Sequence, residues 1–512
     1  MHDNELKSVA KKNYKSPIGK LTKFFEKSRD KWKSKYLDAK YAIKLLKNQV
    51  QYLEKRKAEL KLRVKELEKQ QHQSELKKKD ITEKAIDTKF NLVPAQHTYS
   101  IDHMYLLIRF VFSGCTSMRG SSRIFDLISS FLELGQPSPS WYSVRFWILR
   151  LGYFKLERAK EQADDWIWIV DHTVQLGIEK CLVILGIRQS LLPSSGLHIS
   201  HEDVETIAMM PVTHSNGEVV YEQLTKSINK TGVPMAIVAD HGPDIKSGIE
   251  RFCREHTHTC YLYDIKHKTA SILKRELQND PDWKQFSKNA AQTSKKVQQT
   301  SLSAFASPNQ RSKARYMNVD ILVKWGQDML CYLDQQQIEP SGGYDTEQIQ
   351  EKIGWLNEYR DQLSDWQKLI HMMKIAESHI KYHGIYRDCH IDLKKELDNC
   401  PNSATVDRVR EELVSFAKEQ SLNAVGDERL LGSSEVIESV FGKFKTIEHD
   451  QAKSGFTSML LGLPALLSKT TQDIVKQAME TVPTKKVIEW FKENIGQSVQ
   501  SKRKEILKMA NI

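Results

Sequence analysis

The sequence predicts an α/β protein, with a mixed five-stranded sheet interrupted by a large all-helical insertion and preceded by helical segments. Three observations support this. Short apolar runs rich in β-branched and aromatic residues cluster between residues 161 and 270. Residues 271–430 carry almost no strand pattern, and a heptad repeat occupies residues 21–80. The chain has 512 residues, of which 28% are charged and 40% hydrophobic, so several globular domains fit within it.

Positive charge is concentrated at the N-terminus. Residues 1–80 contain 24 Lys and Arg against 11 Asp and Glu, a net charge of +13, while the whole chain carries +12. A basic segment on a near-neutral body indicates a polyanionic partner, nucleic acid before membrane, although a solvated basic helix without a partner is the alternative. Seven cysteines without a CxxC pair, and no apolar N-terminal segment, predict a cytoplasmic protein with no membrane contact.

The N-terminal region predicts a basic tail, residues 1–20, followed by a coiled-coil helix, residues 21–80. Two apolar seams repeat every seven residues: Phe25, Trp32, Ala39, Leu46, Leu53, Leu60 and Leu67, and Arg29, Tyr36, Ile43, Val50, Lys57 and Val64. This pattern favours a homodimer or higher homo-oligomer formed through the coiled coil, although Arg29 and Lys57 weaken it. A single amphipathic helix docked on its own chain is the alternative.

Residues 95–158 predict a helical, helix-turn-helix-like DNA-binding domain. A helix over 121–134 is followed by a Gly/Pro turn over 135–140 and a second helix over 141–151. The second helix carries Arg145 and Arg150, which would contact DNA. Two helices meeting at a corner of an ordinary core give the same pattern, so plain packing is an equal alternative.

Residues 161–270 predict the first part of a catalytic core. Five strands are expected, over Trp166–Asp171, Cys181–Gln189, Glu205–Thr213, Pro234–Asp240 and Cys260–Asp264. Helices are expected over Val219–Asn229 and Pro243–His256. Because no helix separates the first three strands, they form an antiparallel meander in a mixed sheet.

The remaining chain predicts a helical insertion over 271–430 and a second part of the core over 431–475. Ser433 or Ser434 can cap a helix that carries Glu438 and, two turns later, Lys445. The apolar stretch Phe456–Leu467 is expected to pack on the sheet. Residues 476–512 predict basic C-terminal helices.

Two predicted strands deliver an acid at the same kind of position. Asp171 ends the first strand, and Asp240 ends the fourth. An isolated carboxylate at the end of a buried strand is costly to desolvate, so each acid either lies at the surface or belongs to a site that requires negative charge. The recurrence favours a metal-binding edge of the sheet.

Together with Glu438 and Lys445, these acids resemble the signature of the DDE-type transposases of bacterial insertion sequences, which share the ribonuclease H-like fold with retroviral integrases. The resemblance places the catalytic and metal-binding triad on Asp171 in Val-Asp-His-Thr, Asp240 in Ala-Asp-His-Gly and Glu438 in Val-Ile-Glu-Ser. Lys445 matches the basic residue expected near the cleaved bond. Glu438 lies 198 positions after Asp240, a much longer separation than a minimal integrase-like core needs. Glu435, three residues earlier, is the alternative third acid.

The resemblance implies two Mg²⁺ ions, replaceable by Mn²⁺, with Asp171 bridging both ions and the other two acids completing one each. It further implies cleavage of transposon-end DNA, transfer of the 3′-hydroxyl to target DNA, double-stranded DNA as the partner, and a bacterial protein associated with the nucleoid when bound. Candidate accessory residues follow from position alone: His172 and His241 come after the two Asp residues and would contact the cleaved phosphate or orient the carboxylates, and Asp264 and His267 end the fifth strand, for which a surface strand end is the alternative. A ribonuclease H-like nuclease without strand transfer and an inactive coiled-coil DNA-binding protein are the alternatives.

Overall fold

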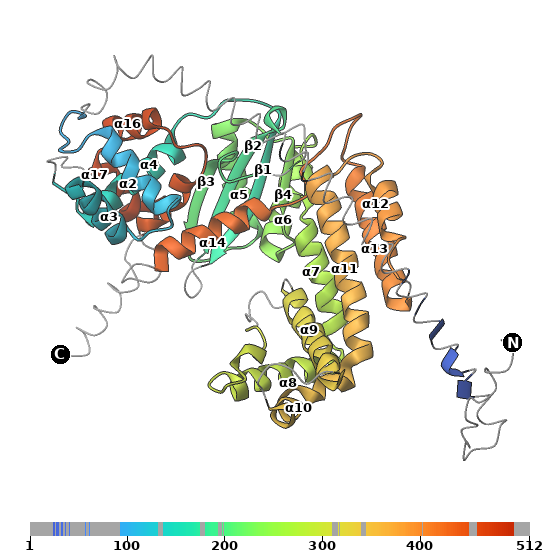
Figure 1. Ribbon diagram of the computed structural model, residues 1–512. Helices are drawn as coiled ribbons and strands as arrows, with labels where there is room; N and C mark the ends of the chain where they lie inside the picture. The colour runs from blue at the N-terminus through green and yellow to red at the C-terminus, as the bar shows by residue number, and fades with distance from the viewer. Residues whose placement is uncertain are drawn as a thin grey trace, which may run out of the picture. The chain divides into compact units, whose positions relative to one another are not determined.

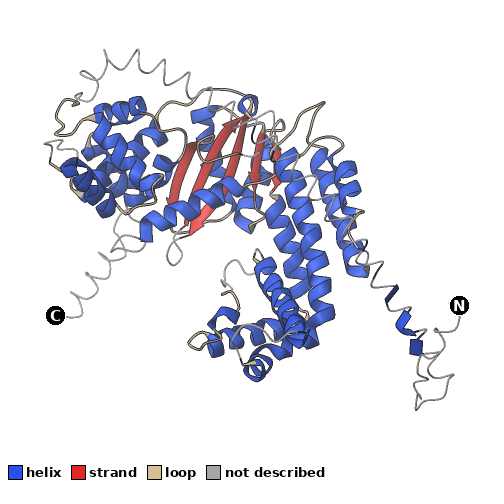
Figure 2. Cartoon of the chain, in the orientation of Figure 1, coloured by secondary structure: helices blue, strands red, loops and turns tan. Residues whose placement is uncertain are grey.

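The computed structural model describes residues 93–131, 137–174, 180–192, 197, 199–309, 316, 318–338, 345–401, 403–449 and 458–495, with scattered residues between 24 and 61 (Figures 1 and 2). The chain divides into two compact units, Met1–Asn91 and Leu92–Ile512. The basic tail and most of the predicted coiled coil lie outside the described residues. Those of the first unit that are described are helical, and Phe25, Trp32 and Tyr36 are each more than half exposed.

The second unit contains the predicted five-stranded mixed sheet. Its strands are β1 (Trp166–Val174), β2 (Lys180–Arg188), β3 (Glu205–Val212), β4 (Ala236–Ala239) and β5 (Cys260–Tyr263). They lie in the order β3-β2-β1-β4-β5. The first three strands are antiparallel, and β4 and β5 continue the sheet in parallel with β1. This mixed topology is compatible with a ribonuclease H-like fold.

Strand β1 is longer than the sequence pattern indicates. Its pairing with β2 continues through His172 and Thr173 to Val174, opposite Lys180. The sequence pattern did not predict this extension, because the apolar run stops at Val170 and polar residues follow. Asp171 therefore lies within the strand, opposite Val183, rather than at its end.

The two faces of the sheet are covered by different helices. Trp166, Trp168 and Val170 share a core with α5 (Gly217–Thr231) and α6 (Pro243–Glu255). The alternate residues, Ile167 and Ile169, belong to the larger core on the opposite face, where α14 (Glu435–His449) packs against β1. Figure 1 shows α14 running across the strands on that face.

The predicted insertion is helical throughout its described part. Its helices are α7 (Ile265–Gln278), α8 (Pro281–Val297), α9 (Val319–Ile338), α10 (Thr346–Ile353), α11 (Arg360–His383), α12 (Cys389–Leu397) and α13 (Ala404–Ser421). Helices α7 and α11 run side by side away from the sheet, and α8, α9 and α10 gather at their far ends (Figure 1). The insertion therefore begins and ends beside the sheet.

A separate helical bundle lies at the β3 end of the sheet. It combines α2 (Ile101–Phe112), α3 (Met118–Phe131) and α4 (Trp141–Glu157) with α15 (Gly462–Leu466), α16 (Gln472–Thr481) and α17 (Thr484–Asn494) (Figure 1). The expectation that the stretch around 456–467 packs on the sheet is wrong for its described part. The short helix Ser458–Leu461 and α15 pack on α4 instead, so closely that a Cβ on Gly152 would meet the Leu461 carbonyl oxygen at 1.7 Å.

Helix α4 is the central helix of this bundle, which overturns Arg150 as a DNA contact. The Arg150 side chain is buried, and its guanidinium donates hydrogen bonds to the carbonyl oxygens of Val482, at 2.5 Å, and Met479. A third guanidinium nitrogen lies 2.8 Å from the His97 ring. Arg150 therefore ties α4 to the end of α16 and cannot reach DNA. Sequence spacing missed this because the partners lie more than 300 residues away.

No helix in the described part of the chain is both long enough and apolar enough to cross a bilayer.

Candidate active site

The two strand-borne acids are neighbours on one face of the sheet. Strands β1 and β4 are parallel and pair Val170 with Ala239, so the next residue on each strand is an acid, Asp171 and Asp240. Adjacent strands lie about 4.8 Å apart. Each acid lies two residues after a residue of the larger core, Asp171 after Ile169 and Asp240 after Val238. Because side chains two residues apart on a strand share a face, both acids lie on the face that α14 covers. Each also accepts a local backbone N–H: Asp171 from His172 at 2.6 Å, and Asp240 from Gly242 at 3.0 Å.

Glu438 lies in the first turn of α14, and its negative charge contributes to the raised pKa of Asp171. Burial, with smaller contributions from the negative charges of Asp240 and Glu438, raises the pKa of Asp171 to about 7 against the opposing effects of His267 and the His172 N–H. The buried face of α14, formed by Ile437, Val440 and Phe444, fixes the helix against the core. We call Asp171, Asp240 and Glu438, which come from β1, the end of β4 and α14, the acidic cluster.

The Asp264 side chain links the start of α14, the helix that carries Glu438, to the start of α7 beside the sheet. This carboxylate is fully buried between β5 and α7. One of its oxygens accepts the backbone N–H of His267 at 2.7 Å, which caps α7, and lies 2.9 Å from the His267 ring nitrogen. The other accepts the N–H and hydroxyl of Ser434, at 2.5 and 2.9 Å. Asp264 thus holds the start of α14 beside the start of α7, although the two are 170 positions apart.

Backbone contacts reinforce this junction. The N–H of Ile265 donates to the carbonyl oxygen of Gly432 at 3.1 Å. Ile385, directly after α11, pairs with Leu430 in an isolated antiparallel bridge. The end of the insertion is therefore fastened at two consecutive points before α14 begins.

Two cations balance the acidic cluster. Lys266 pairs with Glu438 at 2.8 Å, and the His267 ring lies 3.9 Å from the same carboxylate. Burial alone would lower the pKa of His267, but its hydrogen bond to Asp264 and the charges of Asp264, Glu438 and Asp240 raise it to about 9. His267 is therefore cationic at neutral pH. Lys266, in the last residues of the predicted first part of the core, carried no sequence signal of its own.

The alternative acid, Glu435, points elsewhere. It pairs with Lys381 of α11 at 2.5 Å, whereas Glu438, one turn later, pairs with Lys266 and couples to Asp171. The two acids that the sequence left open therefore have different lysine partners, on α7 and α11.

The two histidines that follow the strand acids lie in different surroundings. His172 alternates away from Asp171, and its ring lies 3.7 Å from Asp244 and 3.4 Å from the hydroxyl of Ser215. It is therefore positioned on the opposite face of the sheet from the cluster. His241 stacks on the ring of Tyr263 with centroids 3.5 Å apart. Burial and the charge of Lys246 lower the pKa of His241 to about 4, so its ring is neutral at physiological pH.

The acidic cluster suits hard divalent cations, because carboxylate oxygens are the ligands that Mg²⁺ and Mn²⁺ prefer. All three acids are half-buried, and partly desolvated like charges are also costly without a counter-ion. In the described part of the chain, the ligand oxygens of Asp171, Asp240 and Glu438 do not all lie within 4.8 Å of one another. Glu438 is held instead by Lys266, so closing the set around an ion requires that pair to loosen.

A large groove opens at the cluster and extends along the insertion. It has a volume of about 1530 Å³ and begins at Asp240, His241 and His267. From there it follows α7 and α8, where its lining includes four exposed lysines: Lys274, Lys284, Lys288 and Lys295. None of the four pairs with an acid within the described residues. Lys284, Lys288 and Lys295 are spaced by four and seven residues, which places them on one face of α8.

The two remaining predicted DNA contacts are accessible to different degrees. Lys445 is exposed on α14, two turns after Glu438. Arg145 is half-buried on the first half of α4, where its guanidinium lies 5.6 Å from the ring centroid of Phe146. DNA contact by Lys445 and by Arg145 therefore stays a prediction.

Comparison with known proteins gives little direct guidance. No protein-family model matches the sequence, and no curated protein is detectably similar to it. Among solved structures, the chain is similar to one titled Drosophila P element transposase strand transfer complex, with 12% sequence identity and a TM-score of 0.35. The match covers 80% of this chain and 99% of the other. Both similarity values are low, so the functional assignment depends on the residues of the site.

Proposed function

We propose that this chain is a DNA transposase of the DDE type, which cleaves DNA ends and joins the freed 3′-hydroxyl to a target strand. The observation that carries the proposal is the adjacency of Asp171 and Asp240 on two parallel strands, on the face of the sheet that the Glu438 helix covers. Three coupled carboxylates in that position, beside a long lysine-lined groove, suit phosphoryl transfer on a polyanion.

The three acids Asp171, Asp240 and Glu438 would hold two Mg²⁺ ions. When bound, such a pair activates the attacking oxygen and stabilises the leaving oxygen of an in-line displacement. Asp264 acts as a positioning residue, because it fixes the start of α14 and thereby the reach of Glu438. Cationic Lys266 and His267 would balance the cluster until ions and DNA phosphates replace them.

The groove along α7 and α8 would hold the DNA strand that leads into the cluster. Its four lysines can contact successive phosphates, and neutral His241 at its inner end can donate a hydrogen bond to a phosphate oxygen. We place Lys445 and Arg145 among further backbone contacts.

Replacing Lys284 and Lys288 with Ala should weaken DNA binding about tenfold or more at physiological salt. The slope of log affinity against log salt should fall by about 2, because two phosphate contacts are lost. Fluorescence anisotropy with a labelled duplex at several salt concentrations measures both quantities. Lys296→Ala is the matched control, because Lys296 is exposed on the same helix but lies outside the groove. Equal losses in both variants would remove the groove from the DNA path.

Transposition requires two ends to be held together, and we propose that the N-terminal heptads supply the contact between copies. Phe25, Trp32 and Tyr36 belong to these seams and are more than half exposed in the single chain. Leu46→Asp together with Leu53→Asp should convert the homo-oligomer to a monomer, as measured by sedimentation equilibrium. Gln51→Asp, outside both seams, should leave the oligomer intact; a wild-type protein that is already monomeric would refute the assignment.

The test of function is incubation of the full-length protein with Mg²⁺ and duplexes made from the inverted repeats that flank its coding sequence. We expect nicked ends, followed by products in which the 3′-end is joined to a second duplex. Cleavage without any joined product would identify a ribonuclease H-like nuclease instead, and DNA binding without cleavage would indicate an inactive DNA-binding protein.

A further inference from the structure

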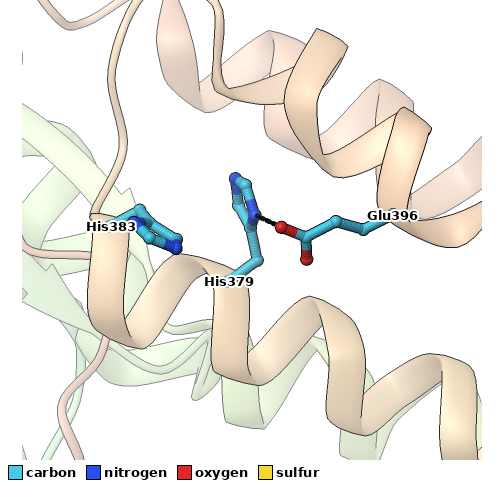
Figure 3. Close-up of side chains that lie close together, drawn as sticks. All are labelled: His379, His383 and Glu396. Atoms are coloured by element: carbon cyan, nitrogen blue, oxygen red, sulfur yellow. Dashed lines mark hydrogen bonds and ion pairs between the residues drawn. The ribbon is translucent and has the colours of Figure 1, made fainter. Parts of the chain in front are cut away.

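A second group of potential metal ligands lies far along the chain from the acidic cluster, at the corner between α11 and α12. His379 and His383 are one turn apart at the end of α11, and Glu396 comes from the last turn of α12 (Figure 3). One ligand atom from each residue lies within 4.8 Å of the other two. No other set of three His, Cys, Asp or Glu side chains in the described part of the chain gathers this closely.

The distances suit a tetrahedral zinc site. Zinc bonds to histidine nitrogen and carboxylate oxygen are about 2.0–2.1 Å long, so ligand atoms around one ion lie about 3.3 Å apart. His379 Nδ1 and Glu396 Oε1 are 3.0 Å apart, and the rings of His379 and His383 have centroids 5.1 Å apart. One ring nitrogen of His383, whose side chain is exposed, lies within 4.8 Å of the ligand atoms of both other residues.

The surroundings of His379 also match those of a zinc ligand. Its side chain is almost fully buried, and with Nδ1 toward Glu396 its other nitrogen, Nε2, lies 3.5 Å from the hydroxyl of Tyr386. That hydroxyl donates to Asp392 at 2.8 Å. Ligating histidines are commonly oriented by a polar partner at the second nitrogen, often one that leads to a carboxylate. The His379–Tyr386–Asp392 chain would hold the ring in the required orientation.

The His383 ring distinguishes a metal site from an ordinary ion pair. A hydrogen bond between His379 and Glu396 needs no third residue. Yet His383 lies beside them on the same end of α11, and within the described residues its ring makes no hydrogen bond. Two histidines four residues apart on a helix, with a carboxylate from the next helix, form a set that zinc binds in proteins.

We propose that His379, His383 and Glu396 form a zinc site that fastens α11 to α12, with the fourth position open to solvent. The site lies at a turning point of the chain. Helix α11 ends at Gly384, whose φ of +72° turns the backbone, and the next residue, Ile385, pairs with Leu430 on the way to α14. A metal at this corner would stabilise the return of the insertion to the sheet. This proposal is independent of the proposed DNA chemistry.

The test uses full-length protein stripped with a chelator and titrated with Zn²⁺ in excess Mg²⁺, monitored by calorimetry and thermal unfolding. Asp171→Asn serves as the parent, so that the acidic cluster does not compete. We expect one Zn²⁺ per chain and a rise in the unfolding temperature on binding. His383→Ala and Glu396→Gln should each abolish both effects. Tyr386→Phe should weaken Zn²⁺ affinity about 10- to 100-fold through the lost orienting hydroxyl.

His371→Ala is the matched control, because His371 is an exposed histidine on the same helix that lies outside the cluster. It should bind Zn²⁺ like the parent. Absence of bound Zn²⁺ in the parent, or unchanged binding in both His383→Ala and Glu396→Gln, overturns the proposal. Because every readout is metal binding or unfolding temperature, the outcome does not depend on whether the protein cleaves DNA.

Discussion

Asp171→Asn should lower the rate of Mg²⁺-dependent DNA cleavage about 10³-fold or more while leaving DNA affinity nearly unchanged. Asp171 is the member of the cluster that lies within a central strand, beside Asp240 and coupled to Glu438. Loss of its charge removes the ligand expected to be shared by two ions, which costs several kcal/mol of transition-state stabilisation. Single-turnover cleavage of an end-labelled duplex measures the rate, and anisotropy measures the affinity. A variant that cleaves at the wild-type rate would contradict the assignment.

The same substitution should stabilise the metal-free protein. The pKa of Asp171 is raised to about 7 in the folded state, from 3.8. Between those values the unfolded chain loses its proton first, so the folded state is destabilised progressively as pH rises from about 4 to 7 and by the full amount above 7. Asp171→Asn should therefore raise the free energy of unfolding by about 1–3 kcal/mol at pH 8 and by little at pH 4. Denaturant titration in chelator measures this difference.

Asp244→Asn provides the control of opposite sign. Burial would raise the pKa of Asp244, but its hydrogen bonds to Lys180 and Ser215 and the nearby His172 lower it to about 2. That stability is present above about pH 4 and is lost as pH falls through about 2. The Asn variant should thus be less stable than wild type at neutral pH. If Asp171→Asn were also destabilising at pH 8 in chelator, the two strand acids would not form a strained, metal-free cluster.

Asp264→Ala should cost both stability and cleavage. It removes a buried carboxylate that accepts four hydrogen bonds and leaves Ser434 and His267 without their partner. The expected loss is about 3 kcal/mol or more, because buried charge partners are left unpaired. Since α14 loses its anchor, cleavage and Mn²⁺ affinity should both fall under conditions where the variant is still folded. Chemical denaturation and Mn²⁺ titration at low temperature separate the two effects.

Asp280→Ala is the matched control for Asp264. Asp280 also caps a helix: its side chain accepts the N–H of Asp282 at the start of α8 and the indole N–H of Trp366 on α11, and within the described residues no hydrogen bond joins it to α14. It should cost about 1 kcal/mol and leave Mn²⁺ affinity unchanged. Equal Mn²⁺ affinities in the two variants would mean that Asp264 is only a helix cap.

The sheet could be predicted from sequence because its information is local. The runs around Trp168, Ile184 and Val238 are apolar, short and separated by turn residues, so strand number and approximate bounds followed from pattern. Asp171 and Asp240 were identified because each directly follows such a run. Strand β1 was cut short only where polar His172 and Thr173 continue the pairing.

The features that failed depend on contacts between distant segments. Arg150 has the spacing of an exposed basic residue, and only the C-terminal helices, which are remote in sequence, bury it. Glu438 and Glu435 could not be separated by sequence because they differ in their partners, Lys266 of α7 and Lys381 of α11, which are remote in sequence. His379 and His383 carry a recognisable one-turn spacing, but Glu396, which gives that spacing meaning, comes from the following helix.

Binding of Mn²⁺ to four matched proteins, followed by electron paramagnetic resonance of the free ion, tests most directly whether the three carboxylates serve one metal centre. Wild type should bind two ions per chain in the presence of DNA. Asp240→Asn and Glu438→Gln should each lose at least one of the two ions. Glu435→Gln should bind Mn²⁺ like wild type, because Glu435, one turn before Glu438 on α14, pairs with Lys381 of α11 instead. A Glu438→Gln protein that binds Mn²⁺ as wild type does, or a Glu435→Gln protein that loses an ion in its place, would contradict the account.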